Sequence, residues 1–306
     1  MILIGENIHI ISKKIREALI NFDEDFLKGL IKIQKNLDYA DLNVGPAKSQ
    51  MKGVLCRLAK LVESNSDLGI SFDTTNSEEI KEALNCTKKP EKCFINSTTY
   101  DEDRLEKMTD LAGEYNCNLI ALTLSKETGI PKSADGRLEI AFGIYEKCLE
   151  KGIDSEKIYF DPLTLPICVE QSQAVEALHT IQMIKESFDP PVKTVVGLSN
   201  ISNGCPKNMR PLINRVFGVL AYGAGLDAAI IDAKDIELVR IFKMLEKNQP
   251  EKSVDFLYIR LSDMIRNFSE LEDVDFDATS KDETEIIKCA EIILNKKIYS
   301  HSFTQI

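Results

Sequence analysis

The chain contains no tryptophan, only three histidines and no C-x-x-C pair among its eight cysteines. Without such a pair or a Cys/His cluster, neither a disulfide framework nor a zinc site is expected. No stretch reaches the roughly 18 uninterrupted apolar residues that a membrane-spanning helix needs. Residues 1–6 lack a basic segment followed by a long apolar one, so no secretory signal peptide is expected. We therefore expect a cytoplasmic location and no membrane association.

The chain also lacks an excess of positive charge. It has 38 Lys and Arg against 49 Asp and Glu, which gives a formal net charge of -11. Because nucleic-acid-binding proteins need a basic footprint, a nucleic-acid partner is not expected. With 306 residues, 43% of them hydrophobic, the chain is long enough for a sizeable core. We expect one domain over residues 1–306.

Several catalytic motifs are missing as well. The sequence has no G-x-G-x-x-G run, no P-loop and no serine nucleophile elbow, which argues against dinucleotide-binding and esterase functions. His9, His179 and His301 are isolated from one another in the sequence, so metal ligation by them is not expected.

What the sequence does contain is a regular alternation of strands and helices. The segment 49–63, for example, carries apolar residues with a helical period. The predicted strands cover about residues 1–5, 39–44, 68–74, 93–97, 117–124, 157–161, 193–198 and 226–232. The predicted helices cover about residues 12–37, 49–63, 76–84, 102–115, 138–151, 171–188, 211–222 and 284–294. Eight evenly spaced units predict a (β/α)₈ TIM barrel, with an open doubly wound sheet as the alternative.

One segment, at about 247–283, interrupts this alternation. Its first half is amphipathic and its second half is an acidic tract, residues 270–277. We expect an insert in the eighth helical region, at the periphery of the barrel. It either covers one face of the barrel or docks a partner.

Polar side chains stand at the ends of most predicted strands. Six short apolar runs end in an Asp or Asn, namely at Asn43, Asp73, Asn96, Asp161, Asn200 and Asp232. Glu6 and Asn7 follow the first strand. In a barrel of this kind the carboxyl ends of the strands meet at one mouth, where active sites lie. We therefore expect these side chains to surround one site.

The chemistry of this set favours a neutral heterocycle. Carboxylates accept hydrogen bonds, and amides both donate and accept them, which suits a ligand rich in N–H, NH₂ and C=O groups. A phosphorylated sugar would instead require a glycine-rich nest or an arginine. Each residue also has a structural alternative, because Asp73 or Asn76 could cap a helix and Asn96, Asp161 or Asn200 could be a turn residue.

The strand ends resemble a known family. The similar segments are Asp41-Leu-Asn43-Val-Gly-Pro46, Ser71-Phe-Asp73-Thr-Thr-Asn76, Ile95-Asn96-Ser-Thr98, residues 122–131, Asp161-Pro-Leu-Thr-Leu-Pro166 and Gly197-Leu-Ser-Asn200-Ile-Ser. They resemble the pterin-binding methyltransferases, above all methyltetrahydrofolate:corrinoid/iron–sulfur protein methyltransferase. The resemblance covers nearly the whole chain except the insert. It implies a homodimeric TIM barrel that moves a methyl group between N5 of tetrahydrofolate and the cobalt of a cobamide on a separate, transiently bound corrinoid protein.

The resemblance also implies roles for single residues. Asp73, Asn96 and Asp161 match positions that bind the pterin ring, and Asn200 matches an asparagine that reaches toward N5. Asp73 and Asp161 are also expected to assist catalysis by stabilising a protonated pterin. Further expected substrate contacts are Asn43, Glu6, Ser199, Asn203 and Lys126.

Two of these positions depart from the pattern or have an alternative. Asn203 stands where the family has a glutamine, and Lys126 either neutralises the folate glutamate tail or is solvated. The loop 204–210 is longer than usual, so a folate contact by Arg210 is only weakly indicated. No side chain is an obvious proton donor to N5, and water linked through Asn200 and the aspartates is the expected source.

Two other functions remain open. Dihydropteroate synthase shares this barrel but requires a lysine after the seventh strand and an Arg/His pair near the eighth, and neither is found here. A non-catalytic subunit that only binds folate or a corrinoid protein is the second alternative. The sequence contains no Asp-x-His-x-x-Gly cobalamin-binding run of its own. It indicates neither the corrinoid partner nor the direction of methyl transfer.

Overall fold

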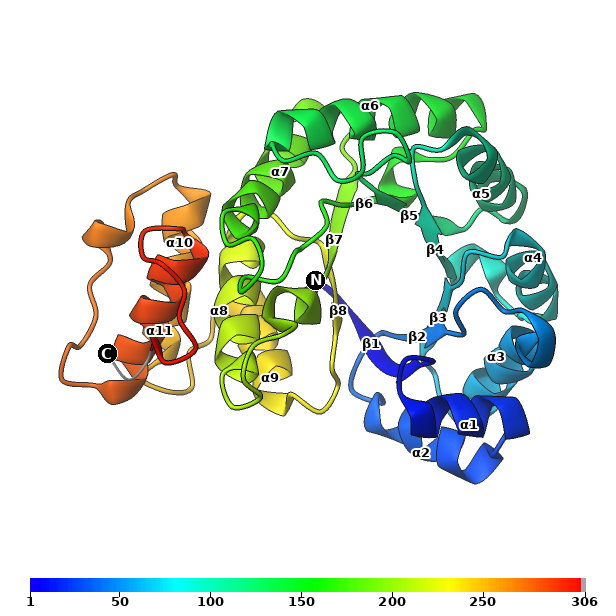
Figure 1. Ribbon diagram of the computed structural model, residues 1–306, viewed down its shortest axis with the longest axis horizontal. Helices are drawn as coiled ribbons and strands as arrows, with labels where there is room; N and C mark the ends of the chain where they lie inside the picture. Colours follow the sequence, from blue (N-terminus) through cyan, green and yellow to red (C-terminus); the bar gives the residue numbers. More distant parts are fainter. Residues whose placement is uncertain (304–306) are drawn as a thin grey trace.

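Eight parallel strands close into a barrel surrounded by helices (Figure 1). The computed structural model describes residues 1–303, except for the side chain of Ser49. The strands are β1 Ile2–His9, β2 Tyr39–Asn43, β3 Gly69–Asp73, β4 Phe94–Thr98, β5 Asn118–Leu122, β6 Ile158–Asp161, β7 Lys193–Gly197 and β8 Ala228–Ile231. Each pairs with the next and β8 pairs with β1, so the predicted TIM barrel is confirmed and the open sheet is excluded.

The helices follow the strands in the predicted order. They are α1 Lys13–Asn21, α2 Glu24–Ile33, α3 Val54–Asn65, α4 Ser77–Cys86, α5 Glu102–Tyr115, α6 Ala134–Glu150, α7 Gln173–Ser187, α8 Arg210–Gly223, α9 Ile236–Lys247, α10 Asp255–Arg266 and α11 Lys281–Ile293. No helix within residues 1–303 is long and apolar enough to cross a membrane.

The barrel interior is apolar toward the amino ends of the strands and polar toward their carboxyl ends. Ile4, Phe94, Ile120, Tyr159, Val195 and Ala228 form one buried cluster contributed by six strands. Side chains on one face of a strand recur every second residue. Two residues further along β4 and β6 the interior positions are polar, at Asn96 and Asp161. These polar groups therefore lie at the mouth of the barrel that the carboxyl ends of the strands form.

The single helix predicted over residues 12–37 is wrong. The structure has α1 and α2 instead, separated at Phe22, whose backbone is left-handed with φ 50°. The Asp23 side chain then accepts a hydrogen bond from the Phe26 backbone N–H at 3.1 Å and caps α2. An aspartate at the N-cap satisfies an amide that would otherwise lack a partner, so a new helix begins there.

The first strand is longer than predicted. It extends to His9 rather than Gly5, with an irregular register against β2 between Gly5 and Ile8. Glu6 and Asn7 thus belong to the strand rather than to a following loop. Gly5 is required by packing, because a Cβ there would lie 2.1 Å from Oε1 of the buried Gln34.

The sequence indicated no disulfide framework, but the described residues include one disulfide bond. Cys56 on α3 and Cys86 on α4 are bonded, with a Cα–Cα distance of 5.8 Å. The two residues are 30 positions apart in the sequence. Their pairing depends on the packing of two neighbouring helices, which no local motif such as C-x-x-C reports.

Removal of this bond should destabilise the protein. A cross-link over a loop of this length contributes about 2–4 kcal/mol by restricting the unfolded chain. We expect Cys56→Ser/Cys86→Ser to lower the free energy of unfolding by that amount in urea titrations. A thiol reductant should have the same effect on the wild type and none on the double variant. A wild type that is insensitive to reductant would contradict the prediction.

The segment after β8 lies partly outside the barrel. Helices α10 and α11 flank α8 on its outer side, away from the strands (Figure 1). Gly223 of α8 allows a close approach, because a Cβ there would lie 2.3 Å from the Ser262 carbonyl oxygen of α10. Arg240 of α9 binds the buried Asp255 of α10 at 2.6 Å. The region 247–283 thus contains α10 and a short 3₁₀ turn, Leu271–Asp273; its origin as an insert stays a prediction.

Candidate functional site

The ends of β2, β3 and β4 place three of the predicted residues side by side. In the strand register Asn43 is opposite Asp73, and Asp73 is opposite Asn96. The Asn43 side-chain amide donates a hydrogen bond to the Asp73 carboxylate. This contact holds the Asp73 side chain within the mouth. By contrast, Asn76 does cap α4, since it accepts hydrogen bonds from the backbone N–H groups of Glu78 and Glu79.

A buried carboxyl group that was not among the predicted site residues joins this cluster. Asp41 accepts hydrogen bonds from Ser71 Oγ at 2.5 Å and from Asn96 Nδ2 at 3.1 Å. Asp41 precedes Asn43 by two residues on β2, so both face the interior. That alternation was the available sequence signal, and it was missed because Asp41 does not stand at the strand end.

Asp41 and Asp73 affect each other's ionisation. Burial and the neighbouring charge of Asp73 raise the pKa of Asp41 well above its usual value. Burial also raises the pKa of Asp73, while the amide of Asn43 opposes this rise. Two adjacent buried carboxyl groups do not readily carry two charges, and this repulsion adds to burial in raising the pKa of Asp41.

Arg104 of α5 supplies positive charge to the same side of the mouth. Its Nε and Nη2 atoms donate to the Ser97 carbonyl oxygen at 3.1 and 2.8 Å. Its charge lowers the pKa of Asp73, against the stronger effect of burial. Arg104 lies within a helix, where no strand-end rule points to it, so sequence reasoning did not find it.

Asp161, at the end of β6, is a separate acidic group. Its Oδ1 atom accepts from the Leu163 backbone N–H at 2.7 Å. Burial raises the pKa of Asp161 to about 7, although the nearby Arg137 guanidinium and backbone donors, including Gly197, lower it. The substrate-free protein therefore holds here a carboxyl group that changes its charge near neutral pH.

The loop after β7 carries the remaining predicted residues. Asn200 lies in the 3₁₀ turn Leu198–Ser202 and is exposed. Its Oδ1 atom accepts from Asn203 Nδ2 at 3.4 Å, and its Nδ2 atom lies over Gly197, 2.8 Å from where a Cβ would be. Asp161 and Asn200 thus adjoin the same glycine. The missing side chain of Gly197 makes room for the Asn200 amide.

Glu6 links this loop to β1. Ser199 Oγ donates to Glu6 Oε1 at 2.6 Å. Burial, the largest effect, raises the pKa of Glu6, the charge of Asp232 raises it further, and the Ser199 hydroxyl opposes the rise. Asp232 in turn accepts from Asn7 Nδ2 at 2.5 Å across the junction of β1 and β8. These contacts fix the ends of β7, β8 and β1 relative to one another.

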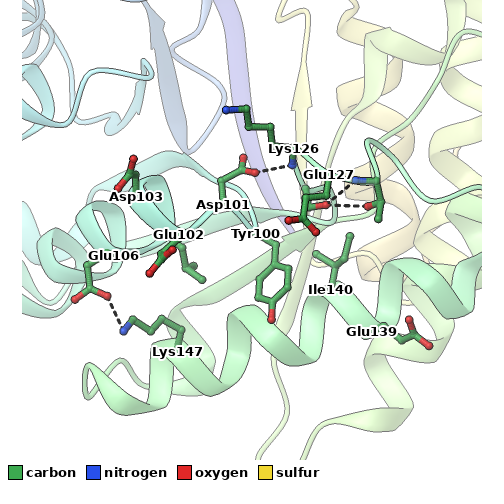
Figure 2. A pocket seen from close by; sticks show the side chains of 13 residues that line it. Tyr100, Asp101, Glu102, Asp103, Glu106, Lys126, Glu127, Glu139, Ile140 and Lys147 are labelled. Atoms are coloured by element: carbon green, nitrogen blue, oxygen red, sulfur yellow. Dashed lines mark hydrogen bonds and ion pairs between the residues drawn. The ribbon is translucent and has the colours of Figure 1, made fainter.

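Two cavities lie among the loops that follow the strands. One of 590 Å³ is lined by Glu6 and Ser199 together with the beginnings of α8 and α9. The other, of 810 Å³, lies between α5 and α6 along the outside of the barrel, and its labelled side chains are mostly acidic (Figure 2). Within residues 1–303 no three His, Cys, Asp or Glu side chains are grouped so that they could hold a metal ion.

Lys126 lies apart from the other predicted residues. It stands on the loop after β5 at the rim of the outer cavity, with its backbone N–H bonded to Asp101 Oδ1 at 2.5 Å. Figure 2 shows its side chain extending away from Tyr100 and Ile140. No ion pair of its ammonium group occurs among the described residues. A substrate contact by Lys126 stays a prediction.

Known proteins resemble the chain in sequence. It is 31% identical over 264 residues to methionine synthase of Mycobacterium tuberculosis, covering 81% of this chain and 21% of that protein. It is 29% identical over 279 residues to methionine synthase of Mycobacterium leprae, covering 85% and 22%. The chain thus spans about a fifth of the length of these relatives.

Solved structures resemble it in fold. Dihydropteroate synthase of Yersinia pestis has a TM-score of 0.56 at 13% identity, covering 80% of this chain and 93% of that chain. The enzyme of Coxiella burnetii in complex with pteroic acid has a TM-score of 0.57 at 14% identity, covering 81% and 94%. At such low identity these matches show the fold alone.

The family assignment comes from a profile match. Residues 40–232, from β2 to the residue after β8, match the model of the pterin-binding enzymes. This range covers more than half of the chain and contains Asp41, Asp73, Asn96, Asp161 and Asn200. The chain belongs to the family of pterin-binding enzymes.

Proposed function

We propose that the protein is a methyltransferase that moves a methyl group between N5 of methyltetrahydrofolate and the cobalt of a cobamide carried by a separate corrinoid protein. The observation that carries the proposal is the position of Asn200. Its amide lies over Gly197 at the end of β7, the glycine whose backbone N–H donates to Asp161, and dihydropteroate synthase would need a lysine after this strand. The chain is similar in sequence to methionine synthases. Their name indicates the synthesis of methionine, an amino acid that carries a methyl group, and this supports methyl transfer.

The pterin would bind between the two acidic groups of the mouth. Asp73, Asn96 and Asp161 offer carboxylate and amide oxygens to the amino group and ring N–H groups. Asn43 orients Asp73 through its hydrogen bond, and Asp41 orients Asn96. The remaining assigned contacts are Glu6, Ser199, Asn203 and Lys126.

The reaction is an in-line displacement. Co(I) supplies both electrons of the new Co–C bond, while N5 keeps the electron pair of the broken C–N bond and takes up a proton. An amine is a poor leaving group, so a proton or a strong hydrogen bond must reach N5 as the bond breaks. Asn200 cannot release a proton, but its amide can donate to N5 or accept from protonated N5.

The proton itself would come from water held by Asn200 and Asp161. A carboxyl group with a pKa of about 7 exchanges protons readily at neutral pH. Its carboxyl group accepts from the backbone N–H of Gly197, the residue over which the Asn200 amide lies. The two side chains thus have separate tasks: Asp161 sets the local charge, and Asn200 directs the hydrogen bond to N5.

The cobamide is a substrate on another protein in this proposal. A transient complex would bring its cobalt to the mouth, and the chain itself would act as a homodimer. The direction of transfer and the identity of the corrinoid protein are left open. A non-catalytic folate-binding subunit is the alternative, and it gives no reason for an exposed Asn200 amide over Gly197.

A spectroscopic assay tests the proposal. The purified protein, methyltetrahydrofolate and cob(I)alamin or a panel of corrinoid proteins should convert Co(I) to methyl-Co(III), seen as a change in the visible spectrum. Pterin diphosphate and p-aminobenzoate should give no condensation product. Folate binding without methyl transfer to any acceptor would favour the binding subunit, and condensation would establish a synthase.

A further inference from the structure

Two cysteines that the proposed reaction does not use lie on the two loops that meet beside Asn200. Cys168 stands on the loop between β6 and α7, and Cys205 stands on the loop between β7 and α8. The backbone N–H of Ile167 donates to the Ile201 carbonyl oxygen at 2.9 Å and joins the two loops. The segment that carries Asn200 is therefore attached directly to the segment that carries Cys168.

The Cys168 sulfur is in contact with the residues immediately before Cys205. Its thiol donates to the Asn203 carbonyl oxygen at 3.1 Å. A Cβ at Gly204 would lie 2.9 Å from the same sulfur, so the missing side chain allows this approach. The Cys205 thiol interacts with the Tyr299 hydroxyl and with the Cys168 thiol. The fold thus brings together two thiols that are remote from each other in the sequence.

The two thiols differ in their access to solvent. Cys168 is partly exposed, whereas Cys205 is only 2% exposed. Burial, the largest effect, raises the pKa of Cys205, although the hydrogen bond from Tyr299 opposes this rise. A buried thiol that keeps its proton reacts slowly with reagents in solution. A small oxidant therefore reaches Cys168 first, and Cys205 is placed to react with the product.

The contact of Cys168 leads to Asn200 through a single residue. Asn203 accepts from Cys168 at its carbonyl oxygen, and its side-chain amide donates to Asn200 Oδ1 at 3.4 Å. A covalent bond at the Cys168 sulfur removes the thiol hydrogen, so Asn203 loses this donor. A disulfide also requires the two sulfur atoms to come closer than hydrogen-bonded thiols do. The segment from Asn203 to Cys205 must then shift, together with the amide that holds Asn200.

We infer that Cys168 and Cys205 form a thiol–disulfide modification site that controls the position of the loop carrying Asn200. In the first step the Cys168 thiolate attacks one sulfur of a low-molecular-weight disulfide, whose S–S bond breaks. The half that leaves takes up the proton from Cys168. Cys205 then attacks the Cys168 sulfur, and the second half leaves with the proton from Cys205. Two cysteine thiols are thus oxidised to one disulfide, and the small disulfide is reduced to two thiols.

The expected consequence is a slower reaction at the mouth. Formation of the bond is independent of the proposed function, whereas its effect on methyl transfer rests on that function. A displaced Asn200 no longer directs its amide to N5, so methyl transfer should be about tenfold slower or more. Because a thiol reductant cleaves the bond, it should restore the rate.

Peptide mapping by mass spectrometry after incubation of the full chain with oxidised glutathione tests the site. The wild type should yield a peptide pair joined through Cys168 and Cys205, and dithiothreitol should remove it. The rate of methyl transfer, measured before oxidation, after it and after reduction, should fall and recover with the bond.

Two variants separate this site from other cysteine chemistry. Reduced Cys168→Ser should transfer methyl groups at the wild-type rate, because a serine hydroxyl can still donate to the Asn203 carbonyl oxygen. After oxidation it should keep that rate. Cys56→Ser/Cys86→Ser, which lacks the disulfide between α3 and α4, should lose activity on oxidation as the wild type does.

Three results would overturn the inference. Cys168 and Cys205 could remain unbonded in oxidised glutathione, Cys205 could bond to Cys289 of α11 instead, or the bond could form and leave the rate unchanged. The reduced wild type tests the proposed function separately. If it transfers no methyl group, the proposed function is refuted, and the mapped peptides still decide whether the modification site exists.

Discussion

Asn200→Ala is expected to slow methyl transfer to the cobamide at least tenfold, with little change in folate affinity. The reason is that the Asn200 amide supports N5 mainly while the C–N bond breaks. A single preoriented hydrogen bond to charge that develops in a transition state contributes about 2.7–4 kcal/mol, or about 10²–10³ in rate. Single-turnover rates with saturating methyltetrahydrofolate, together with the dissociation constant of tetrahydrofolate, measure the two effects separately.

Asn208→Ala provides the matched control for this variant. Asn208 is an exposed asparagine in the same loop, eight positions further along, and it lines neither cavity. The Asn208→Ala variant should transfer methyl groups at the wild-type rate. An Asn200→Ala variant with the wild-type rate would remove this residue from the mechanism. An equal loss in folate affinity would make Asn200 a binding residue only.

The second large effect is expected from Asp161→Asn, which should lose folate while it gains stability. A hydrogen bond to a charged group contributes about 1.5–3 kcal/mol, so folate should bind about 10–100-fold more weakly. In Asp161→Asn an NH₂ donor also replaces one acceptor oxygen of the carboxyl group. This donor would face the N–H groups of the pterin, which are donors as well. Fluorescence titration of the pterin measures this loss, and unchanged affinity would contradict the assignment.

The gain in stability follows from the pKa of Asp161. Burial raises it from 3.8 to about 7, so between these pH values the folded protein binds a proton more tightly than the unfolded chain. The stability of the substrate-free wild type should therefore fall as the pH rises from about 4 to 7, and this loss should be complete above 7. The full difference corresponds to about 4 kcal/mol, an upper limit.

Urea unfolding at pH 5 and pH 8 tests this dependence. The contribution of Asp161 should make the wild type less stable at pH 8 than at pH 5. Asp161→Asn should remove this contribution to the difference in the free energy of unfolding. Asp263→Asn, a change in an exposed aspartate of α10, should follow the wild type. An Asp161→Asn variant with the wild-type pH dependence would show that the carboxyl group is already ionised in the substrate-free protein.

The barrel could be predicted because its signals are local. A helical period, a short apolar run and a cap residue such as Asn76 each lie within a few positions of one another. The limits of α5, Glu102 and Tyr115, agree with the predicted range 102–115. The division between α1 and α2 was missed because the helical pattern continues on both sides of Phe22, although the left-handed backbone of Phe22 and the cap at Asp23 separate the two helices.

The candidate site could be predicted in part, for the same reason. Polar residues directly after apolar runs identify Asn43, Asp73, Asn96 and Asp161 as mouth residues once the strands are parallel. Arg104 and Asp41 do not follow this rule, since one lies on a helix and the other within a strand. Their contribution depends on distances between segments that are remote in the sequence.

The sequence by itself determined which residues stand at the ends of the strands, because the spacing of apolar and polar residues along one segment is a local property. Tertiary structure alone decided how those residues act on one another. Closure of the barrel buries Asp41 beside Asp73, brings Asn200 and Asp161 to the same Gly197, and brings Cys56 to Cys86. Proton affinity and bonding depend on burial and on neighbours in space, and a linear pattern contains neither.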